Sequence, residues 1–292
     1  MAGAPRDGAR VNILSLQSWV AYGHVGNAAA VFPLQRLGAE VWAVNTVQFS
    51  NHTGYGDWTG RAATAGEIAA LVAGIAARGA FGRCDAVLSG YLGEPAVGEA
   101  VLDAAARAKA ANPGAAYCCD PVIGDAGKGV FVRPGVAAFF AARALPQADI
   151  ATPNQFELEH LTGTRIATLA DAKSAASALQ ARGPRTVLLT SLRTEATPAD
   201  AIDLLAAEGD AFHLLRTPRL PIAANGAGDL IAALFLLYRL RLGAAAPALA
   251  AAASAVFAVL ARTLAEGAQE LALVAAQDEL AAPARRFAAV AC

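Results

Sequence analysis

Short apolar runs alternate with longer alanine- and leucine-rich segments along most of this chain, and this alternation restricts its fold more than any other feature. The short runs have the length of strands, and the longer segments repeat apolar residues at helical spacing. Strands that are apolar along their whole length are typical of a parallel sheet covered by helices on both faces. The sequence therefore predicts an α/β fold.

The expected elements follow from the same pattern. After residue 200, two strand-like runs follow one another with no helix between them, which predicts an antiparallel edge to the sheet. Strands are expected at residues 11–16, 40–47, 85–89, 115–119, 149–152, 186–190, 201–206 and 211–215. Helices are expected at 27–37, 66–78, 95–111, 135–145, 154–161, 170–182, 228–242 and 247–266.

The ends and the composition of the chain limit its organisation. Residues 1–10 are polar and lack the apolar middle of a secretory signal, so we expect a disordered tail, then one domain over residues 11–292. The apolar segments are interrupted by Gly, Pro or charge, so we expect no membrane span and a cytoplasmic location. The 23 basic residues are scattered and the net charge is −1, which argues against nucleic acid as a partner. Small molecules are therefore the expected partners.

One segment near the end of the last expected strands predicts an anion site. Gly226-Ala227-Gly228-Asp229 stands directly before a strong helical run, and glycines at a helix start let backbone N–H groups converge on a phosphate. Asp229 has two interpretations at this point. It is either an N-terminal helix cap or a base that accepts a proton from a hydroxyl attacking phosphorus.

Carboxylates follow two other expected strands. Asp120 and Asp125 come after the strand at 115–119, and Glu157 follows the strand at 149–152. Oxygen ligands at neighbouring strand ends suit a hard cation such as Mg²⁺, held largely through waters beside phosphates. The alternative is local: Asp120 caps a turn before Pro121, and Glu157 only decorates a first helical turn.

These residues, taken with longer segments, resemble the pyridoxal kinases of the ribokinase-like superfamily, in particular the bacterial pyridoxal/pyridoxamine kinase type. The resemblance runs from about residue 11 to residue 283. It is carried by residues 17–27, QSWVAYGHVGN, and 45–56, NTVQFSNHTGYG, together with SGYLG at 89–93 and the segments around Asp120, Thr152 and Asp229. It implies a three-layer αβα sandwich with a mostly parallel central sheet and an antiparallel edge.

The resemblance also implies a function and its site residues. The implied reaction is transfer of the ATP γ-phosphate to the 5′-hydroxyl of pyridoxal, with pyridoxamine and pyridoxine as further candidates, to form pyridoxal 5′-phosphate in vitamin B6 salvage. Asp229 would be the base, with Gly226, Ala227 and Gly228 around the transferred phosphoryl group. The implied vitamer contacts are Ser18, Val25, Val47, Phe49, Thr53, Gly54, Tyr91 and Asp229. The implied ATP contacts are Asp120, Thr152, Asn154, Glu157, Thr190, Ser191, Leu220, Pro221 and Ile222.

Cofactors and assembly follow from the same resemblance. It implies ATP and Mg²⁺, with Asp120, Asp125 and Glu157 around the metal, and it leaves open a requirement for a monovalent cation such as K⁺. The expected assembly is a homodimer. A mobile lid is expected over residues 124–131, whose glycines permit movement.

Three departures from the family pattern bear on substrate choice. Trp19 stands where the family usually has His, Val130 stands where some members carry a cysteine, and Ala227 replaces a Thr or Val. Two other functions therefore stay open, a hydroxymethylpyrimidine kinase and a weakly active carrier of a B6 vitamer. Phosphorylation assays on the candidate substrates distinguish all three.

Overall fold

A ten-stranded sheet runs through the whole protein, for which a computed structural model describes residues 10–292. Its strand order is β12-β11-β10-β9-β8-β5-β4-β1-β2-β3, and the six strands from β9 to β2 are parallel. β10 to β12 are antiparallel at one edge, and β3 is antiparallel at the other. The strands are β1 (Asn12–Val20), β2 (Glu40–Phe49), β3 (Gly60–Ala62), β4 (Ala86–Ser89), β5 (Ala116–Cys119), β8 (Ile150–Ala151), β9 (Thr186–Leu192), β10 (Ala201–Glu208), β11 (Ala211–Pro218) and β12 (Val290–Ala291). A separate hairpin is formed by β6 (Gly124–Asp125) and β7 (Gly129–Val130).

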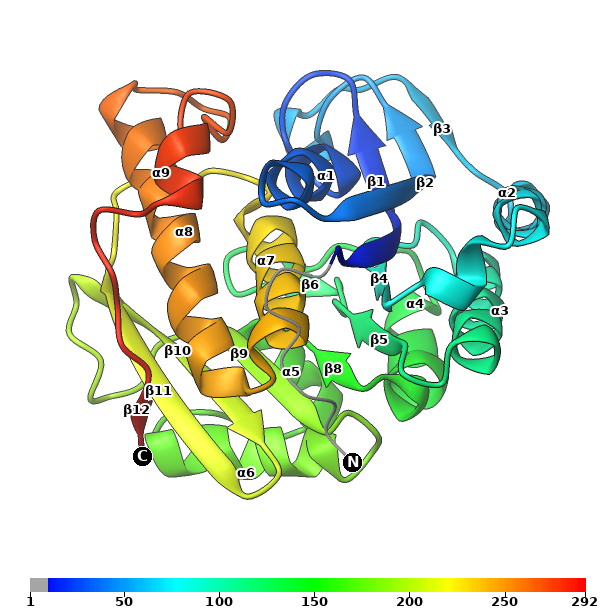
Figure 1. Ribbon diagram of the computed structural model, residues 1–292. Helices are drawn as coiled ribbons and strands as arrows, with labels where there is room; N and C mark the ends of the chain where they lie inside the picture. The colour runs from blue at the N-terminus through cyan, green and yellow to red at the C-terminus, as the bar shows by residue number, and fades with distance from the viewer. Residues whose placement is uncertain (1–9) are drawn as a thin grey trace.

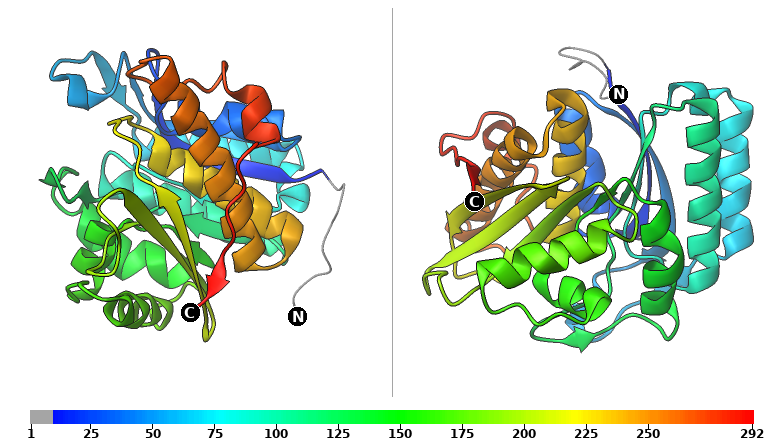
Figure 2. Two further views of the ribbon diagram at one scale, coloured as in Figure 1. Left: turned by 90° about the vertical axis from the view of Figure 1, so that its left-hand side faces the viewer. Right: turned by 90° about the horizontal axis from the view of Figure 1, so that it is seen from below.

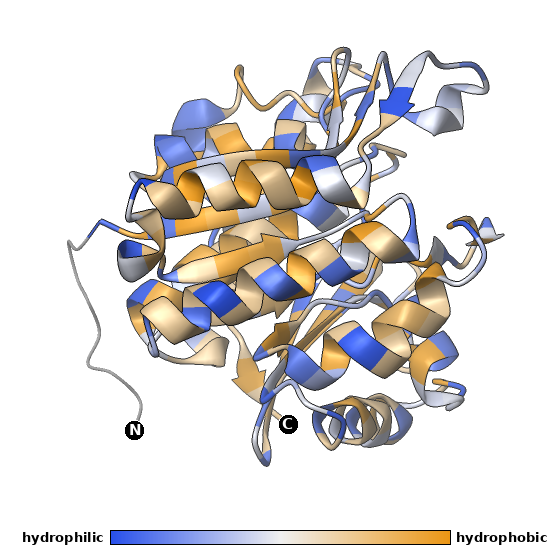
Figure 3. Cartoon of the chain, turned by 90° about the vertical axis from the view of Figure 1, so that its right-hand side faces the viewer, coloured by the Kyte–Doolittle hydropathy of each residue, from blue (hydrophilic) through white to orange (hydrophobic). Residues whose placement is uncertain are grey.

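Helices cover both faces of this sheet, which gives three layers (Figures 1 and 2). One face carries α1 (Asn27–Arg36), α7 (Ala227–Leu242), α8 (Ala245–Ala265) and α9 (Gln277–Ala281). The other carries α2 (Ala65–Ala77), α3 (Pro95–Ala111), α4 (Val136–Phe139), α5 (Gln155–Thr162) and α6 (Leu169–Gln180). Apolar residues lie on the strands and the inward sides of the helices, and hydrophilic residues lie outward (Figure 3). The predicted sandwich with an antiparallel edge is confirmed.

The side chains at the helix starts explain several boundaries. Thr64 and Glu67 form a reciprocal capping box at α2, in which each side chain accepts a hydrogen bond from the other residue's backbone N–H. Thr168 and Asp171 do the same at α6. Pro95 opens α3 at a position where its missing N–H has no intrahelical partner in any case. Local chemistry thus fixes where these helices begin.

The segment at 135–145 differs from the single helix expected there. α4 ends at Phe139, a wider π turn follows over Phe140–Ala144, and a short 3₁₀ turn over Leu145–Gln147 ends it. Phe139 and Phe140 are both buried, although an α-helix places successive side chains about 100° apart. The wider turn changes the angle between these two side chains. The apolar pattern of the sequence did not reveal this turn.

Helix α8 corrects one expectation from the sequence. With 21 residues and a hydropathy of 1.8, it is long and apolar enough to cross a membrane, although we expected no such segment. Half of its apolar window is nevertheless buried inside the protein. It packs against α7, β10 and β11, which is the position of a core helix. The expected disordered tail falls on residues 1–10, of which residues 1–9 lie outside the described residues.

Candidate active site

The glycines expected to cradle a phosphate lie at the start of α7. Gly226 precedes the helix with φ of 88°, and a Cβ there would lie 1.8 Å from the His24 carbonyl oxygen, so only glycine fits. At Gly228 an added Cβ would meet nothing within 4 Å, so the space above this turn is open. The free N–H groups of a helix start and its dipole attract an anion into that space.

Asp229 lies between two helix starts. It belongs to the first turn of α7, and its carboxylate accepts a hydrogen bond from the backbone N–H of Gly26, the residue that precedes α1. Burial raises the pKa of Asp229 to about 6, against the lowering effect of the backbone donors Gly26 and Asp229 itself. A carboxylate with such a pKa is ionised at neutral pH and is more basic than an ordinary aspartate. Gly26 had no role assigned from the sequence, although it lies in the segment QSWVAYGHVGN.

Two further carboxylates face the same region from the sheet. Asp120 follows β5, and Glu157 lies in the first turn of α5 after β8; both are buried. Burial, then the negative charges of Glu157 and Asp229, raise the pKa of Asp120 well above its usual value. Burial also raises the pKa of Glu157 to about 7, although backbone N–H donors act against it. The hydroxyl of Thr152 donates to Asp120 at 3.1 Å.

The contacts of these groups modify the predicted metal site. Glu157 is engaged by the backbone, since its carboxylate accepts N–H groups of Ile123 and Asn154, each at 2.9 Å, and forms a capping box with Asn154. Asp125 is exposed, at the start of the β6–β7 hairpin. Within residues 10–292, no group of three or more His, Cys, Asp or Glu side chains is arranged to hold a metal directly. Buried carboxylates that repel one another still suit a cation bound through waters.

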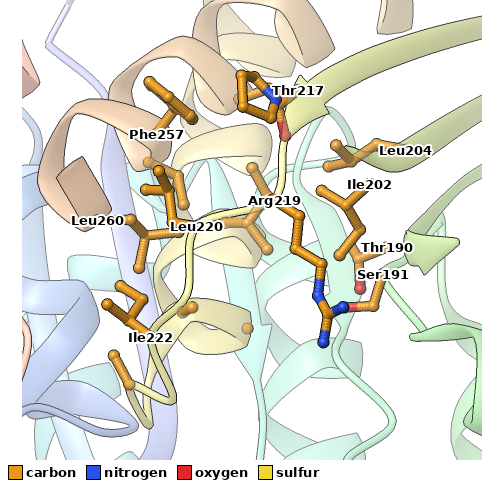
Figure 4. A pocket seen from close by; sticks show the side chains of 17 residues that line it. Thr190, Ser191, Ile202, Leu204, Thr217, Arg219, Leu220, Ile222, Phe257 and Leu260 are labelled. Carbon is orange, nitrogen blue, oxygen red and sulfur yellow. The ribbon is translucent and has the colours of Figure 1, made fainter. Parts of the chain in front are cut away.

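A cavity of about 290 Å³ lies beside the cradle, between the β9–β11 strands, the loop before α7, and α8 (Figure 4). Its walls include four of the residues implied for ATP, together with two cradle residues. These are Thr190, Ser191, Leu220, Ile222, Ala227 and Gly228. Pro221 lines a second cavity on the other side of the same loop. Asp120, Thr152, Asn154 and Glu157 do not line the 290 Å³ cavity.

Most of the apolar walls of this cavity were missed from the sequence. Ile202, Leu204, Val256, Phe257 and Leu260 line it, yet in the sequence they are indistinguishable from core positions of β10 and α8. No signal in the chain marks them as ligand contacts.

Two polar features of the cavity stand out. Ser191 has φ of 54° at the end of β9, the only positive value at a non-glycine residue in the part of the chain described. Backbone strain of this kind is concentrated at functional sites. Arg219 was also missed, and its guanidinium lies beside Thr190 and Ser191 (Figure 4). It supplies positive charge to a cavity whose walls are otherwise uncharged.

Four of the residues implied for the vitamer lie in or against one small apolar cluster. Val25, Val47 and Phe49 form a small apolar cluster with Val20, separate from the two main cores, and Tyr91 packs against it. A shift in register between β1 and β2 at Gln17 and Trp19 lies beside Ser18. Thr53 and Gly54 lie in an exposed 3₁₀ turn after β2. The Trp58 ring covers Phe49, with 4.0 Å between ring centroids.

Comparison with known proteins places this geometry in a family. A pyridoxal kinase PdxY of Granulibacter bethesdensis is 59% identical over 286 residues, covering 97% of this chain and 100% of that protein. The chain belongs to the pyridoxal kinase family. A second member, pyridoxal kinase PdxY of Deinococcus radiodurans, is 57% identical over 284 residues and covers 95% of each chain.

Two further comparisons agree on the kind of fold. Residues 69–272 match the family model described as Phosphomethylpyrimidine kinase. The solved pyridoxal kinase from Leishmania donovani in complex with ADP and pyridoxamine superposes with a TM-score of 0.89 at 28% identity, over 96% of this chain and 99% of that one. The resemblance inferred from the sequence is therefore confirmed at the level of family and fold.

Proposed function

We propose that this member of the pyridoxal kinase family transfers the γ-phosphate of ATP to the 5′-hydroxyl of pyridoxal. The observation that carries the proposal is Asp229, a carboxylate with a pKa of about 6 in the helix turn where Ala227 and Gly228 line the nucleotide cavity. The 59% identical relative is named a pyridoxal kinase, which supports pyridoxal as the acceptor.

The proposed chemistry uses the cradle and the base together. Asp229 accepts the proton of the attacking hydroxyl, and the N–H groups at the start of α7 stabilise negative charge on the moving phosphoryl group. The apolar cluster of Val25, Val47 and Phe49 packs on the pyridine ring, which orients the hydroxyl toward Asp229. Positioning and electrostatic stabilisation supply most of the rate in such transfers.

The nucleotide takes the other side of the cradle. Its base packs on the apolar walls of the 290 Å³ cavity, and Arg219 and the strained Ser191 contact its polar part. Asp120 would hold Mg²⁺ through water, with Glu157 and Asp125 adding negative charge nearby. The ion would neutralise charge on the phosphates. We also propose the β6–β7 hairpin as the lid that excludes water from the transferred phosphoryl group.

A hydroxymethylpyrimidine kinase is the second candidate, and the match of residues 69–272 to the Phosphomethylpyrimidine kinase model favours it. Both reactions use the same cradle and carboxylates. They differ in the acceptor pocket, where Trp58, in the segment after β2, covers Phe49 and presents an apolar surface. That surface and the full-length identity to pyridoxal kinases favour the B6 vitamer.

The test is ATP-dependent phosphorylation by the purified protein with Mg²⁺, on pyridoxal, pyridoxamine, pyridoxine and hydroxymethylpyrimidine. We expect the highest kcat/KM with pyridoxal. A higher value with hydroxymethylpyrimidine would transfer the proposal to the second candidate. Measurable pyridoxal binding without turnover of any substrate would instead indicate a carrier. The homodimer and the cytoplasmic location stay predictions, and light scattering tests the first.

A further inference from the structure

Glu270, in the segment after α8, joins two parts of the chain that are far apart in sequence. Its Oε2 accepts the backbone N–H of His24 at 3.0 Å, and its Oε1 accepts the hydroxyl of Tyr55 at 2.7 Å. The hydrogen bond to Glu270 is the main reason that the pKa of Tyr55 is raised to about 12. No pattern in the sequence predicted a role for any of these three residues.

The loop at residues 23–26 is shaped to receive this carboxylate. Gly23 has φ of 94°, and a Cβ there would lie 2.3 Å from Glu270 Oε2. At the other end of the same loop, the N–H of Gly26 donates to Asp229. Glu270 therefore fixes one end of a four-residue loop whose other end holds the proposed base.

Tyr55 belongs to a flap, residues 50–59, between β2 and β3. The flap is closed on itself by bonds from Ser50 N to Thr59 O at 2.8 Å and from Asn51 Nδ2 to Asp57 O at 2.8 Å. It carries Trp58 over Phe49. Tyr55 itself is 41% exposed, so solvent can compete for its hydrogen bond to Glu270 and the flap can open at this residue.

We propose that Glu270 is a positioning residue that latches the flap over the vitamer site and, through the 23–26 loop, holds the Gly26 N–H on Asp229. This inference rests on the proposed kinase function. The two ends of the latch have separable effects, because the Tyr55 hydroxyl ties only the flap to Glu270, whereas Glu270 also holds the 23–26 loop through the N–H of His24.

The kinetic test uses Tyr55→Phe, Glu270→Ala and Glu270→Gln. Tyr55→Phe should raise KM for pyridoxal about three- to tenfold, the size expected for one partly exposed hydrogen bond to a charged group, and leave kcat and KM for ATP unchanged. Glu270→Ala should raise the same KM and also lower kcat. Glu270→Gln should lie between Glu270→Ala and wild type, since an amide can accept from His24 and donate to Tyr55.

A pH profile of kcat distinguishes a loss of positioning at Asp229 from a general loss of folded structure. The Gly26 N–H lowers the pKa of Asp229. Loss of that bond in Glu270→Ala should therefore move the acid limb of kcat to higher pH, while Tyr55→Phe leaves the limb in place. Asp120, the charged side chain that interacts with Asp229, is the same in all variants. Tyr22→Phe is the matched control, because Tyr22 is exposed and its ring lies 6.2 Å from that of Tyr55.

Hydrogen exchange of residues 50–59 gives a readout that does not depend on turnover. Faster exchange of the flap in Tyr55→Phe and Glu270→Ala, but not in Tyr22→Phe, supports the latch even if the wild-type protein phosphorylates no vitamer. Unchanged flap exchange and unchanged KM for pyridoxal in Tyr55→Phe would overturn it. An equal loss of affinity for ATP and pyridoxal in that variant would overturn it too.

Discussion

Replacement of the proposed base by its neutral isostere, Asp229→Asn, should lower activity and raise stability at the same time. The carboxyl pKa is raised from 3.8 to about 6, chiefly by burial. Each unit of that rise is a preference of about 1.4 kcal/mol for the protonated form in the folded state. The ionised carboxylate therefore destabilises the fold at neutral pH, by at most about 3 kcal/mol and by about 1–2 kcal/mol after screening at its partly exposed position.

The direction with pH follows from the sign of this shift. The penalty is absent below the unfolded pKa of about 4, develops as pH rises toward 6, and is constant above that. Asp229→Asn should therefore melt a few degrees above wild type at pH 8, with about half of that gain at pH 5. Its kcat should fall by about 10²- to 10⁴-fold, because no base accepts the hydroxyl proton.

Thermal unfolding at both pH values and single-substrate kinetics measure the two effects. Asp210→Asn is the matched control, since Asp210 is exposed in the turn between β10 and β11, and it should change neither quantity. An Asp229→Asn protein with wild-type turnover would refute the assignment of the base. A melting temperature below that of wild type at pH 8 would refute the argument from burial.

Three further substitutions test the cradle and the carboxylates. Asp120→Asn removes one of the buried carboxylates proposed to hold Mg²⁺, so half-saturating Mg²⁺ should rise about tenfold or more. Titration of activity against Mg²⁺ checks this, and an unchanged Mg²⁺ dependence would contradict the metal proposal. Gly228→Ala should fold as wild type but lose affinity for ATP, since its methyl group enters the open space proposed for the phosphates. Gly226→Ala should instead be destabilised, because its methyl group clashes with the His24 carbonyl. Thermal melts and ATP titrations separate the two variants, and the opposite pattern would contradict the cradle geometry.

The parts of this site that could be predicted from sequence are those where local chemistry determines the answer. Buried parallel strands are apolar along their whole length. Glycines directly before a helix indicate an anion cradle whatever the tertiary contacts of that helix. β3, β6, β7 and β12 were missed because each has only two or three residues and is defined by its partner strand. Most apolar residues of the 290 Å³ cavity were missed for a similar reason, since Leu204 and Phe257 become neighbours only when α8 packs on the sheet.

The same distinction applies to the carboxylates. Asp120 and Glu157 lie close enough for their charges to interact, as expected for the ends of parallel strands at one edge of a sheet, whereas Asp125 is exposed on the β6–β7 hairpin. The Glu157 carboxylate accepts hydrogen bonds from the backbone N–H groups of residues 123–124. These bonds depend on the path of that segment over α5, which no pattern in the sequence indicates. Glu270 is a more extreme case, because its partners are 246 and 215 residues away.

Helix α8, apolar enough to pass for a membrane span, is also placed late in the order of synthesis. The elements it covers, β10, β11 and α7, all precede it in the chain. When α8 leaves the ribosome, its docking surface has therefore already been made, so its apolar face can be buried as soon as it emerges. A fragment that begins after α7 would expose this helix without that cover and would be prone to aggregate or to associate with lipid.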